Sequence, residues 1–320
     1  MAAGLGTRLR PLTYDAPKPM VPVANRPVVE HLLRLLASHR FTEVICNLHW
    51  FPDTIRDALG DGSEFGVELS YEFEQELLGT AGGVRNVRDF FGDEPFVVMA
   101  GDALTDVDVR ALADAHEASD GIATLVAKRV TNTSEYGVIV TDPEARVQGF
   151  QEKPDPAEAL SDRANSMIYA FDPAIFDYFP DRPVVDFALD VFPALLDGDV
   201  PFHVHETSGY WNDVGSVGEY LQGNLDVVTG AVAVQADGEI VDGSSDETEP
   251  AEQAGDWLAS GPVLVGAGAE IAAGAVVNGP AVIGPGARIG SDSLVKGSVL
   301  LPGAEVPPHS FLVGSIAGHR

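Results

Sequence analysis

Cysteine and long apolar runs are almost missing from this chain of 320 residues. Cys46 is the only cysteine, which excludes an intrachain disulfide bond and a cysteine metal cluster. No apolar run is long enough to span a bilayer, so we expect no membrane partner. No basic segment followed by an apolar one opens the sequence, so we expect no secretory signal and a cytoplasmic location.

Positive charge is also scarce. The chain has 49 acidic residues against 19 lysines and arginines, and its net charge is −30. This balance excludes a nucleic-acid partner, because such proteins carry basic surfaces. A carboxylate-rich surface with few lysines is typical of halophilic proteins, since high salt screens the repulsion; an ordinary acidic protein is the alternative. The four lysines are Lys18, Lys128, Lys153 and Lys296, of which Lys128 and Lys296 are expected to be solvated surface cations.

Helical and strand-like patterns alternate up to about residue 230. The helical patterns cover 26–40, 52–62, 80–91 and 109–119, and the strand patterns cover 43–48, 67–74, 95–103 and 122–130. This alternation predicts an α/β domain over residues 1–230 with a doubly wound, mostly parallel, Rossmann-like sheet. Ligands bind beyond the carboxyl ends of the strands in such sheets.

The pattern changes after residue 230. Residues 231–256 are acidic and poor in apolar side chains, which predicts a linker or mobile loop. Residues 257–320 then carry an aliphatic side chain at every sixth position, namely Val265, Ile271, Val277, Ile283, Ile289, Val295 and Leu301. This period resembles that of left-handed parallel β-helices and predicts about three coils. We expect this segment to mediate homo-oligomerisation and to take no part in catalysis.

The sequence begins with "MAAGLGTRLRPLT". Glycines at positions 4 and 6 allow backbone N–H groups to approach phosphate oxygens, and Arg8 adds a planar charged group that suits phosphate. The pattern predicts a phosphate-binding loop, and a simple tight turn is the alternative.

Further motifs extend this pattern into a family resemblance. The opening reads G-x-G-T-R-L-x-P-L-T and is followed by P-K-P-[MLV]-x-P-V. L-G-T-A begins at Leu78, a strand pattern ends at Asp102, E-K-P begins at Glu152, and W-x-D-[IV]-G contains Asp213. Together these motifs resemble the sugar-1-phosphate nucleotidyltransferase family over about the first 220 residues.

The resemblance implies that a nucleoside triphosphate and a sugar 1-phosphate are joined, with release of pyrophosphate. A phosphate oxygen of the sugar attacks the α-phosphorus in line. Both reactants are anions, so catalysis rests on alignment and charge neutralisation and needs no nucleophile from the protein.

The resemblance also implies roles for individual residues. Arg8 holds the departing phosphates, Lys18 lies near the α-phosphate and the sugar phosphate, and Lys153 holds the sugar phosphate. The nucleotide-binding set is Ala2, Ala3, Gly4, Gly6, Thr7, Arg8, Gly79, Thr80 and Gly82. The sugar-phosphate set is Gly137, Glu152, Lys153 and Asn165. Asp102 and Asp213 are expected to bind Mg²⁺, a hard ion that takes carboxylate and phosphate oxygens.

The substrates are expected to be GTP and mannose 1-phosphate, because the motif sequences most resemble those of the mannose-1-phosphate guanylyltransferases. Thymidylyl or uridylyl transfer to glucose 1-phosphate is the alternative within the family. A regulatory paralogue that binds sugar nucleotides without catalysis is the alternative from another class.

Two departures from the family pattern carry expectations of their own. Met167 stands where the family usually has glycine, so it either narrows the sugar pocket or shifts the backbone. The aliphatic strand that precedes the phosphate loop in the family does not precede it here, where only Met1 comes before the motif. We expect about five apolar residues from an upstream start to supply that central strand.

Overall fold

The computed structural model describes residues 1–243, 252–254 and 256–318. The chain forms two compact units. Unit 1 contains Met1–Leu5, Leu32–Ala103 and Val107–Trp211, and unit 2 contains Gly6–His31, Leu104–Asp106 and Asn212–Arg320. The domain boundaries at residues 230 and 256 both fall within the residues of unit 2 and stay predictions.

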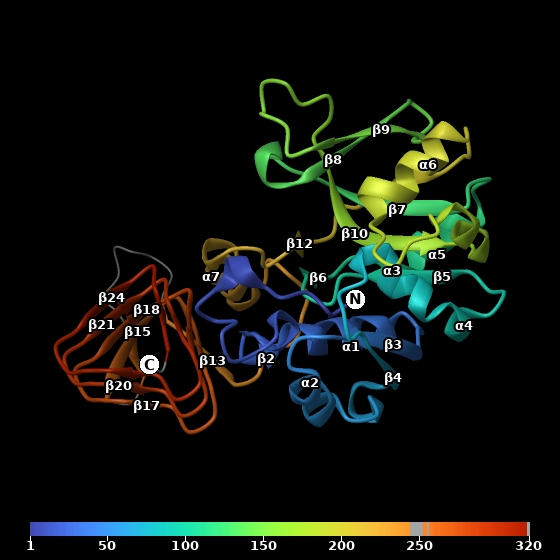
Figure 1. Cartoon of the computed structure of the whole chain (residues 1–320). Coiled ribbons are helices and arrows are strands. Elements are labelled where there is room, and N and C mark those ends of the chain that lie inside the picture. Colours follow the sequence, from blue (N-terminus) through green and yellow to red (C-terminus); the bar gives the residue numbers. More distant parts are fainter. Residues whose placement is uncertain (244–251, 255, 319–320) are drawn as a thin grey trace. The chain divides into compact units, whose positions relative to one another are not determined.

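Unit 1 has the alternating helices and strands that the sequence predicts (Figure 1). Its strands are β3 (Glu43–Leu48), β4 (Glu68–Phe73), β5 (Phe96–Met99), β7 (Ala123–Arg129), β8 (Gly137–Thr141), β9 (Val147–Glu152), β10 (Arg163–Phe171) and β11 (His203–Glu206). Its helices are α2 (Pro52–Leu59), α3 (Gly79–Asn86), α4 (Arg88–Phe91), α5 (Val109–Glu117) and α6 (Phe192–Asp197). Short 3₁₀ or π helices cover Ser63–Phe65, Thr133–Glu135, Pro173–Tyr178 and Phe187–Val191.

The strands of unit 1 form two sheets in the described residues. β3 and β4 make a parallel pair, and the larger sheet has the order β11–β7–β10–β8–β9, with β5 also paired to β10. β11 runs parallel to β7, whereas β10 runs antiparallel to β5, β7 and β8. The first five residues of β7 are buried, so both faces of the strand are covered there, which explains why four of the five are apolar.

An aromatic cluster makes the core of the larger sheet rigid. Tyr169 and Phe171 of β10 are fully buried and pack against Phe187 and Phe192. The rings of Phe171 and Phe187 lie 5.0 Å apart, within the range of stacked aromatic pairs. This packing holds the strands in place and therefore also holds the loops that leave them.

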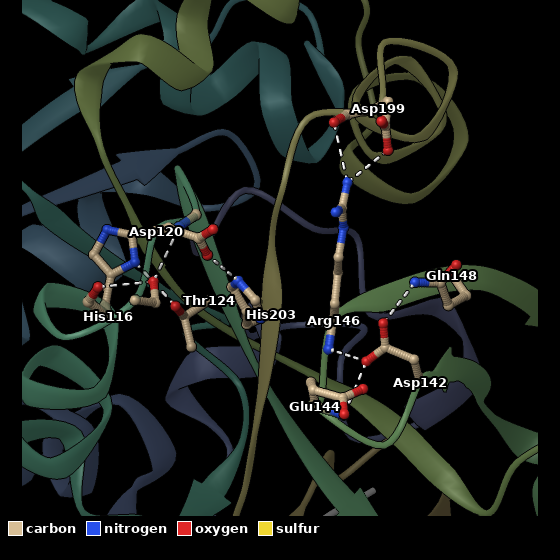
Figure 2. A network of polar contacts seen from close by, with 11 residues as sticks. His116, Asp120, Thr124, Asp142, Glu144, Arg146, Gln148, Asp199 and His203 are labelled. Atoms are coloured by element: carbon tan, nitrogen blue, oxygen red, sulfur yellow. Dashed lines mark hydrogen bonds and ion pairs between the residues drawn. The ribbon is translucent and has the colours of Figure 1, made fainter.

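Polar contacts join the turn between β8 and β9 to Asp199, which comes shortly before β11 in the chain, as Figure 2 shows. Asp142 accepts a hydrogen bond from the backbone of Arg146, whose guanidinium donates to Asp199. Val204 of β11 donates its N–H to the turn at Ala145. These bonds close the edge of the sheet near the beginning of β7, away from the strand ends that the sequence analysis assigns to ligands.

The residues of unit 2 that come early in the chain pack on a late helix. Unit 2 contains β1 (Pro22–Val23), β2 (Arg26–Pro27), β6 (Leu104–Thr105) and α7 (Val217–Val228), with 3₁₀ turns at Thr7–Leu9 and Lys18–Met20. Tyr220 of α7 donates its hydroxyl to the Pro22 carbonyl, 2.6 Å away, and Asn224 accepts the N–H of Ala24. Two elements, α1 (Val28–Ser38) and β12 (Trp211–Asn212), include residues of both units.

A parallel β-helix of three ladders fills the rest of unit 2 (Figure 1). The first ladder is β16 (Pro262–Val265), β19 (Ala281–Ile283), β22 (Val299–Leu300) and β25 (Ile316–Ala317). The second is β15 (Trp257–Ser260), β18 (Val276–Asn278), β21 (Leu294–Lys296) and β24 (Phe311–Val313), and the third is β17 (Glu270–Ile271), β20 (Arg288–Ile289) and β23 (Glu305–Val306). The inward residues form a buried, mostly aliphatic core.

The prediction that inward residues recur at every sixth position is wrong for its last member, Leu301. Ile283 pairs with Leu300, which is fully buried, and Leu301 is only half-buried. The cause is a corner that is shorter by one residue, because residues 278–282 of one coil lie beside residues 296–299 of the next. The chain therefore advances one residue less in this coil, and the inward position moves from 301 to 300.

Part of the segment expected to be a linker forms strands. Residues Glu239–Asp242 make β13, which pairs antiparallel with β16, and Glu252–Ala254 make β14, which pairs with β15. The sequence from 244 to 251 and residue 255 lie outside the described residues.

Met1 and Ala2 lie beside both β5 and β3. Gly101, just beyond β5, donates its N–H to the Met1 carbonyl at 2.6 Å, and Ala2 donates its N–H to Asn47 of β3 at 2.8 Å. β3 and β5 belong to different sheets within the described residues. The central strand that the sequence analysis expects at this place stays a prediction.

We expect Val295→Ala to lower the free energy of unfolding by about 2 kcal/mol, because Val295 is fully buried in the ladder between Val277 and Leu312. Val313→Ala is the matched control, since Val313 lies in the next coil and is 58% exposed. Denaturant unfolding measures both changes. Equal losses in the two variants would contradict an inward aliphatic ladder.

Candidate active site

The two glycines of the opening loop have different surroundings. Gly6 lies in the left-handed region with φ +60°, and a Cβ there would be 3.0 Å from the Cβ of Lys18. Thr13 donates its hydroxyl to the Gly6 carbonyl at 2.7 Å, which fixes this bend. Gly4 has no positive φ, and no described atom lies within 4 Å of its Cβ position. The backbone therefore requires glycine at 6, while the space beside Gly4 is open.

Unit 2 brings Arg8, Lys18 and Asp213 together. Lys18 is 9% exposed, and its Nζ donates to the backbone carbonyl of Asp213 at 2.8 Å. Arg8 lies 3.9 Å from an Asp213 carboxylate oxygen, and its side chain is mostly exposed. Thr7 is in the same 3₁₀ turn as Arg8. A buried ammonium and an exposed guanidinium thus contact the same residue, the first at its backbone carbonyl and the second at its carboxylate. Two cations in one segment group of this kind suit polyphosphate.

A tight turn fixes the carboxylate of Asp213. Its Oδ1 accepts the N–H of Gly215 at 3.2 Å, and Val214 between them has φ +46°. A Cβ at position 215 would lie 2.6 Å from Asp213 Oδ2, so only glycine leaves room for this conformation. The glycine of W-x-D-[IV]-G therefore allows the observed orientation of the Asp213 carboxylate, the predicted metal ligand of this motif.

Unit 1 holds the other candidate metal ligand and the start of the loop. Asp102 is half-buried and follows Gly101, whose N–H binds the Met1 carbonyl. Ala2 and Ala3 are buried. Asp102 therefore lies at the carboxyl end of β5, the end at which the sequence analysis expects ligands.

The Gly79–Gly82 segment at the start of α3 packs closely on the chain at residues 183–187. Thr80 donates its hydroxyl to Asp186 at 2.8 Å and accepts the N–H of Phe187. The Val185 carbonyl accepts the N–H groups of residues 81 and 82. A Cβ at Gly79 would meet Val185 O at 2.4 Å, and one at Gly82 would meet a backbone oxygen at 2.9 Å. These glycines are thus required by chain packing, apart from any contact with nucleotide.

The sugar-side candidates lie on β8 and β9. Gly137 and Glu152 are partners across the two strands, and a Cβ at 137 would be 3.0 Å from a Glu152 carboxylate oxygen. Lys153 is exposed, has φ +45°, and donates its N–H to the Tyr136 carbonyl at 3.1 Å. The structure therefore brings Gly137, Glu152 and Lys153 together at one end of this hairpin.

Asn165 lies on β10 beside the departure at Met167. Met167 has φ +58°, and the pairing of β10 with β7 shifts register between Asn165 and Tyr169. Asn165 accepts the N–H of Met167 at 3.2 Å across this bulge. Burial raises the pKa of the Tyr169 hydroxyl, so that group stays protonated. Methionine thus adopts, at this bulge, a left-handed backbone conformation that glycine adopts more easily.

Lysine 128 lies differently from its predicted place on the solvated surface. It is half-buried, and its Nζ donates to the carbonyls of Ser208 and Gly209 at 3.2 and 2.7 Å. These bonds brace the chain shortly before Trp211 within unit 1. Lys296 is exposed, as expected.

Sequence reasoning missed two polar residues next to the motif segments, Asn47 and Glu74. Glu74 is 3% exposed and hydrogen-bonds Asn47. The alternation along β4 favours exposure of Glu74, together with Glu68 and Glu72, and the alternation breaks at Phe73, which is exposed. No pattern in the sequence signals this burial.

None of the helices in the described part of the chain has the length and apolar character to cross a bilayer.

Comparison with known proteins identifies the family of the chain. The model of the family described as "Nucleotidyl transferase" matches residues 1–230. A UTP–glucose-1-phosphate uridylyltransferase of Synechocystis is 40% identical over 235 residues, covering 69% of this chain and 61% of the relative. A mannose-1-phosphate guanylyltransferase of Mycobacterium tuberculosis is 36% identical over 231 residues, covering 72% and 64%. The chain thus spans less than two thirds of the length of these relatives.

A solved structure supports the same fold. A Bacillus anthracis protein assigned as a glucose-1-phosphate thymidylyltransferase, in complex with sucrose, superposes with a TM-score of 0.63 at 26% identity. The match covers 70% of this chain and 91% of that protein. The predicted Rossmann-like α/β fold class is confirmed.

We expect Met167→Gly to change the free energy of unfolding by no more than about 1 kcal/mol. Relief of a left-handed conformation, about 1–2 kcal/mol, offsets the loss of a half-buried side chain. Ile168→Gly is the control, because Ile168 is fully buried without a positive φ, and its loss is expected to be about 4 kcal/mol or more. Similar losses in denaturant unfolding would show that the Met167 backbone is unstrained.

Proposed function

Because this chain belongs to the nucleotidyl transferase family, we propose that it transfers a nucleotidyl group from a nucleoside triphosphate to a sugar 1-phosphate. The products are a nucleoside-diphosphate sugar and pyrophosphate. The observation that carries the proposal is the grouping of Arg8, Lys18 and Asp213 within unit 2, on segments that also carry the family motifs.

The reaction forms one bond and breaks one. A phosphate oxygen of the sugar 1-phosphate bonds to the α-phosphorus, and the bond from that phosphorus to the bridging oxygen breaks as pyrophosphate leaves. Arg8 is assigned to the departing phosphates, Lys18 to the α-phosphate and Lys153 to the sugar phosphate. Each role requires a cation that keeps its charge while phosphate charge moves, which arginine and lysine supply.

We propose that Asp102 of unit 1 and Asp213 of unit 2 each offer a carboxylate oxygen to Mg²⁺. Both are carboxylates with hard oxygen donors, and the described residues contain no group of three or more histidine, cysteine or acidic side chains able to hold a metal. One or two carboxylates with the remaining ligands from phosphate and water is the usual pattern for Mg²⁺. When bound, the ion would neutralise phosphate charge, and the two aspartates would position it.

The proposal includes two further sets of binding residues. The nucleotide is assigned to Ala2, Ala3, Gly4, Gly6, Thr7, Gly79, Thr80 and Gly82. The sugar phosphate is assigned to Gly137, Glu152 and Asn165. Gly4 is favoured by the open space beside it, and Gly137 by its pairing with Glu152.

For the substrates, we propose GTP and mannose 1-phosphate. The 36% identity to a mannose-1-phosphate guanylyltransferase supports this choice. Uridylyl or thymidylyl transfer to glucose 1-phosphate is the second candidate, favoured by the 40% identity to a uridylyltransferase. The third candidate is a regulatory protein that binds sugar nucleotides without turnover.

We also propose that the β-helix joins copies of the chain into a homo-oligomer. Phe311 and Val313, on β24 at the last described coil, are 79% and 58% exposed, and exposed apolar groups of this kind favour association. A cytoplasmic location and adaptation to high salt stay predictions.

Pyrophosphate release, measured across a panel of nucleoside triphosphates and sugar 1-phosphates at high and low salt, tests the proposed function. The expected result is highest kcat/KM for GTP with mannose 1-phosphate. Highest activity with UTP or dTTP and glucose 1-phosphate would move the assignment to the second candidate. Binding of sugar nucleotide without pyrophosphate release from any pair would leave the regulatory candidate.

We expect Asp102→Asn and Asp213→Asn each to lower kcat about a hundredfold or more, and to raise the Mg²⁺ concentration needed for half-maximal rate. Removing one charged ligand weakens both the affinity for the ion and its alignment. Asp93→Asn is the control, since Asp93 is an exposed carboxylate shortly before β5. Full activity of Asp213→Asn at low Mg²⁺ would refute the role of that residue.

A further inference from the structure

A chain of buried hydrogen bonds in unit 1 joins the two segments that the proposed function assigns to the nucleotide. Ala2 donates its N–H to Asn47 Oδ1 at 2.8 Å, and Asn47 Nδ2 donates to Glu74 Oε1 at 2.6 Å. Glu74 Oε2 accepts the N–H of Leu78 at 3.1 Å. Asn47 is 9% exposed and Glu74 is 3% exposed, so water does not replace these bonds readily.

The backbone brings the two side chains to this place through the parallel pair β3 and β4. Asn47 lies on β3, and Glu74 extends β4 by donating its N–H to the Leu48 carbonyl at 2.8 Å. His49 then hydrogen-bonds the Glu74 carbonyl at 2.9 Å. Both the N–H and the carbonyl of Glu74 are thus hydrogen-bonded, and its carboxylate oxygens are held by Asn47 and Leu78.

Donor and acceptor roles along this chain follow from the carboxylate. An ionised glutamate only accepts hydrogen bonds, so Asn47 must turn its NH₂ group toward Glu74. Its oxygen is then left for the N–H of Ala2. Glu74 thus determines, through the orientation of one amide, whether the backbone at Ala2 finds an acceptor.

The helix above the pair supplies an independent observation. A Cβ on Gly83 of α3 would lie 2.5 Å from Glu74 Oε1 and 2.7 Å from Asn47 Nδ2. Glycine within a helix is unfavourable by about 1 kcal/mol relative to alanine. The chain nevertheless has glycine at position 83, at this cost in helix stability, because any side chain there would displace the hydrogen-bonded pair.

We propose that Glu74 and Asn47 are positioning residues for nucleotide binding, an inference that rests on the proposed function. They hold the backbone at Ala2, in the phosphate loop, and at Leu78, next to the L-G-T-A segment, in one fixed relation within unit 1. Their contacts reach the nucleotide only through these two backbone segments, and neither side chain is assigned a contact with substrate.

Exchanging amide and carboxylate tests the proposal. In Glu74→Gln, the new amide must offer its oxygen to Leu78, so its NH₂ group turns toward Asn47. Asn47 must then turn its oxygen to Gln and its NH₂ group to the N–H of Ala2, where two donors meet. In Asn47→Asp, two carboxylates oppose each other in a buried place.

The double variant restores every partner. With Glu74→Gln and Asn47→Asp combined, the aspartate accepts from both the glutamine and Ala2, while the glutamine oxygen accepts from Leu78. Each single variant is expected to raise the Kd and KM for the triphosphate about tenfold or more, because one buried hydrogen bond of charged character is lost. The double variant is expected to return to within about threefold of the original protein, and the KM for sugar 1-phosphate should stay unchanged throughout.

Glu68→Gln is the control, because Glu68 is an exposed carboxylate at the beginning of the same strand, β4. Unchanged triphosphate binding in both single variants, or a double variant as weak as the weaker single, would overturn the proposal. A merely structural role would lower the free energy of unfolding without this reciprocal rescue of Kd.

Amide hydrogen exchange at Ala2 and Leu78, measured without substrate, separates this inference from the proposed function. Loss of protection in the single variants and its return in the double variant supports the link, even if no substrate pair gives pyrophosphate. Unchanged protection in the single variants overturns the link, whatever the transfer assay shows.

Discussion

The buried carboxylate of Glu74 requires hydrogen-bond donors, and this requirement determines how the motif segments of unit 1 are arranged. A desolvated carboxylate without partners is strongly unfavourable. Glu74 therefore draws the amide of Asn47 and the backbone of Leu78 toward it. The remaining oxygen of Asn47 then meets Ala2, and the helix above must carry glycine at position 83. One charge thus orders two loops and part of a helix.

In unit 2, the buried ammonium of Lys18 likewise fixes the path of the chain. Lys18 is one of four lysines in a chain of net charge −30, and its ammonium reaches the backbone oxygen of Asp213. The carboxylate of the same residue accepts the N–H of Gly215 and lies near Arg8. In an acidic protein the few lysines are not needed for surface balance. Both Lys18 and Lys128 instead donate to backbone carbonyls, which fixes the paths of the chain at residues 213 and 208–209.

Glycines in the motifs serve several physical purposes. Gly79 and Gly82 are required by close packing on residues 183–187, and Gly215 by the carboxylate of Asp213. Gly6 is required by a positive φ, whereas Gly4 has open space beside it. A glycine-rich motif can therefore be kept for packing of the protein on itself as well as for approach to phosphate. Met167 shows the converse, since a residue with a side chain occupies a left-handed position at the bulge of β10.

Several features followed from the sequence alone, because they depend on neighbours along the chain. The alternation of helices and strands predicted the α/β fold, and the six-residue period predicted the β-helix up to Val295. The motifs assigned Arg8, Lys18 and Asp213 to one function, which stays a prediction, and the structure brings the three residues together in unit 2. Tertiary structure alone decided that Glu74 is buried and that Leu300 replaces Leu301 in the ladder. Local periodicity follows from the geometry of one strand or helix, whereas the burial of Glu74 and the length of a coil depend on which distant segment lies opposite.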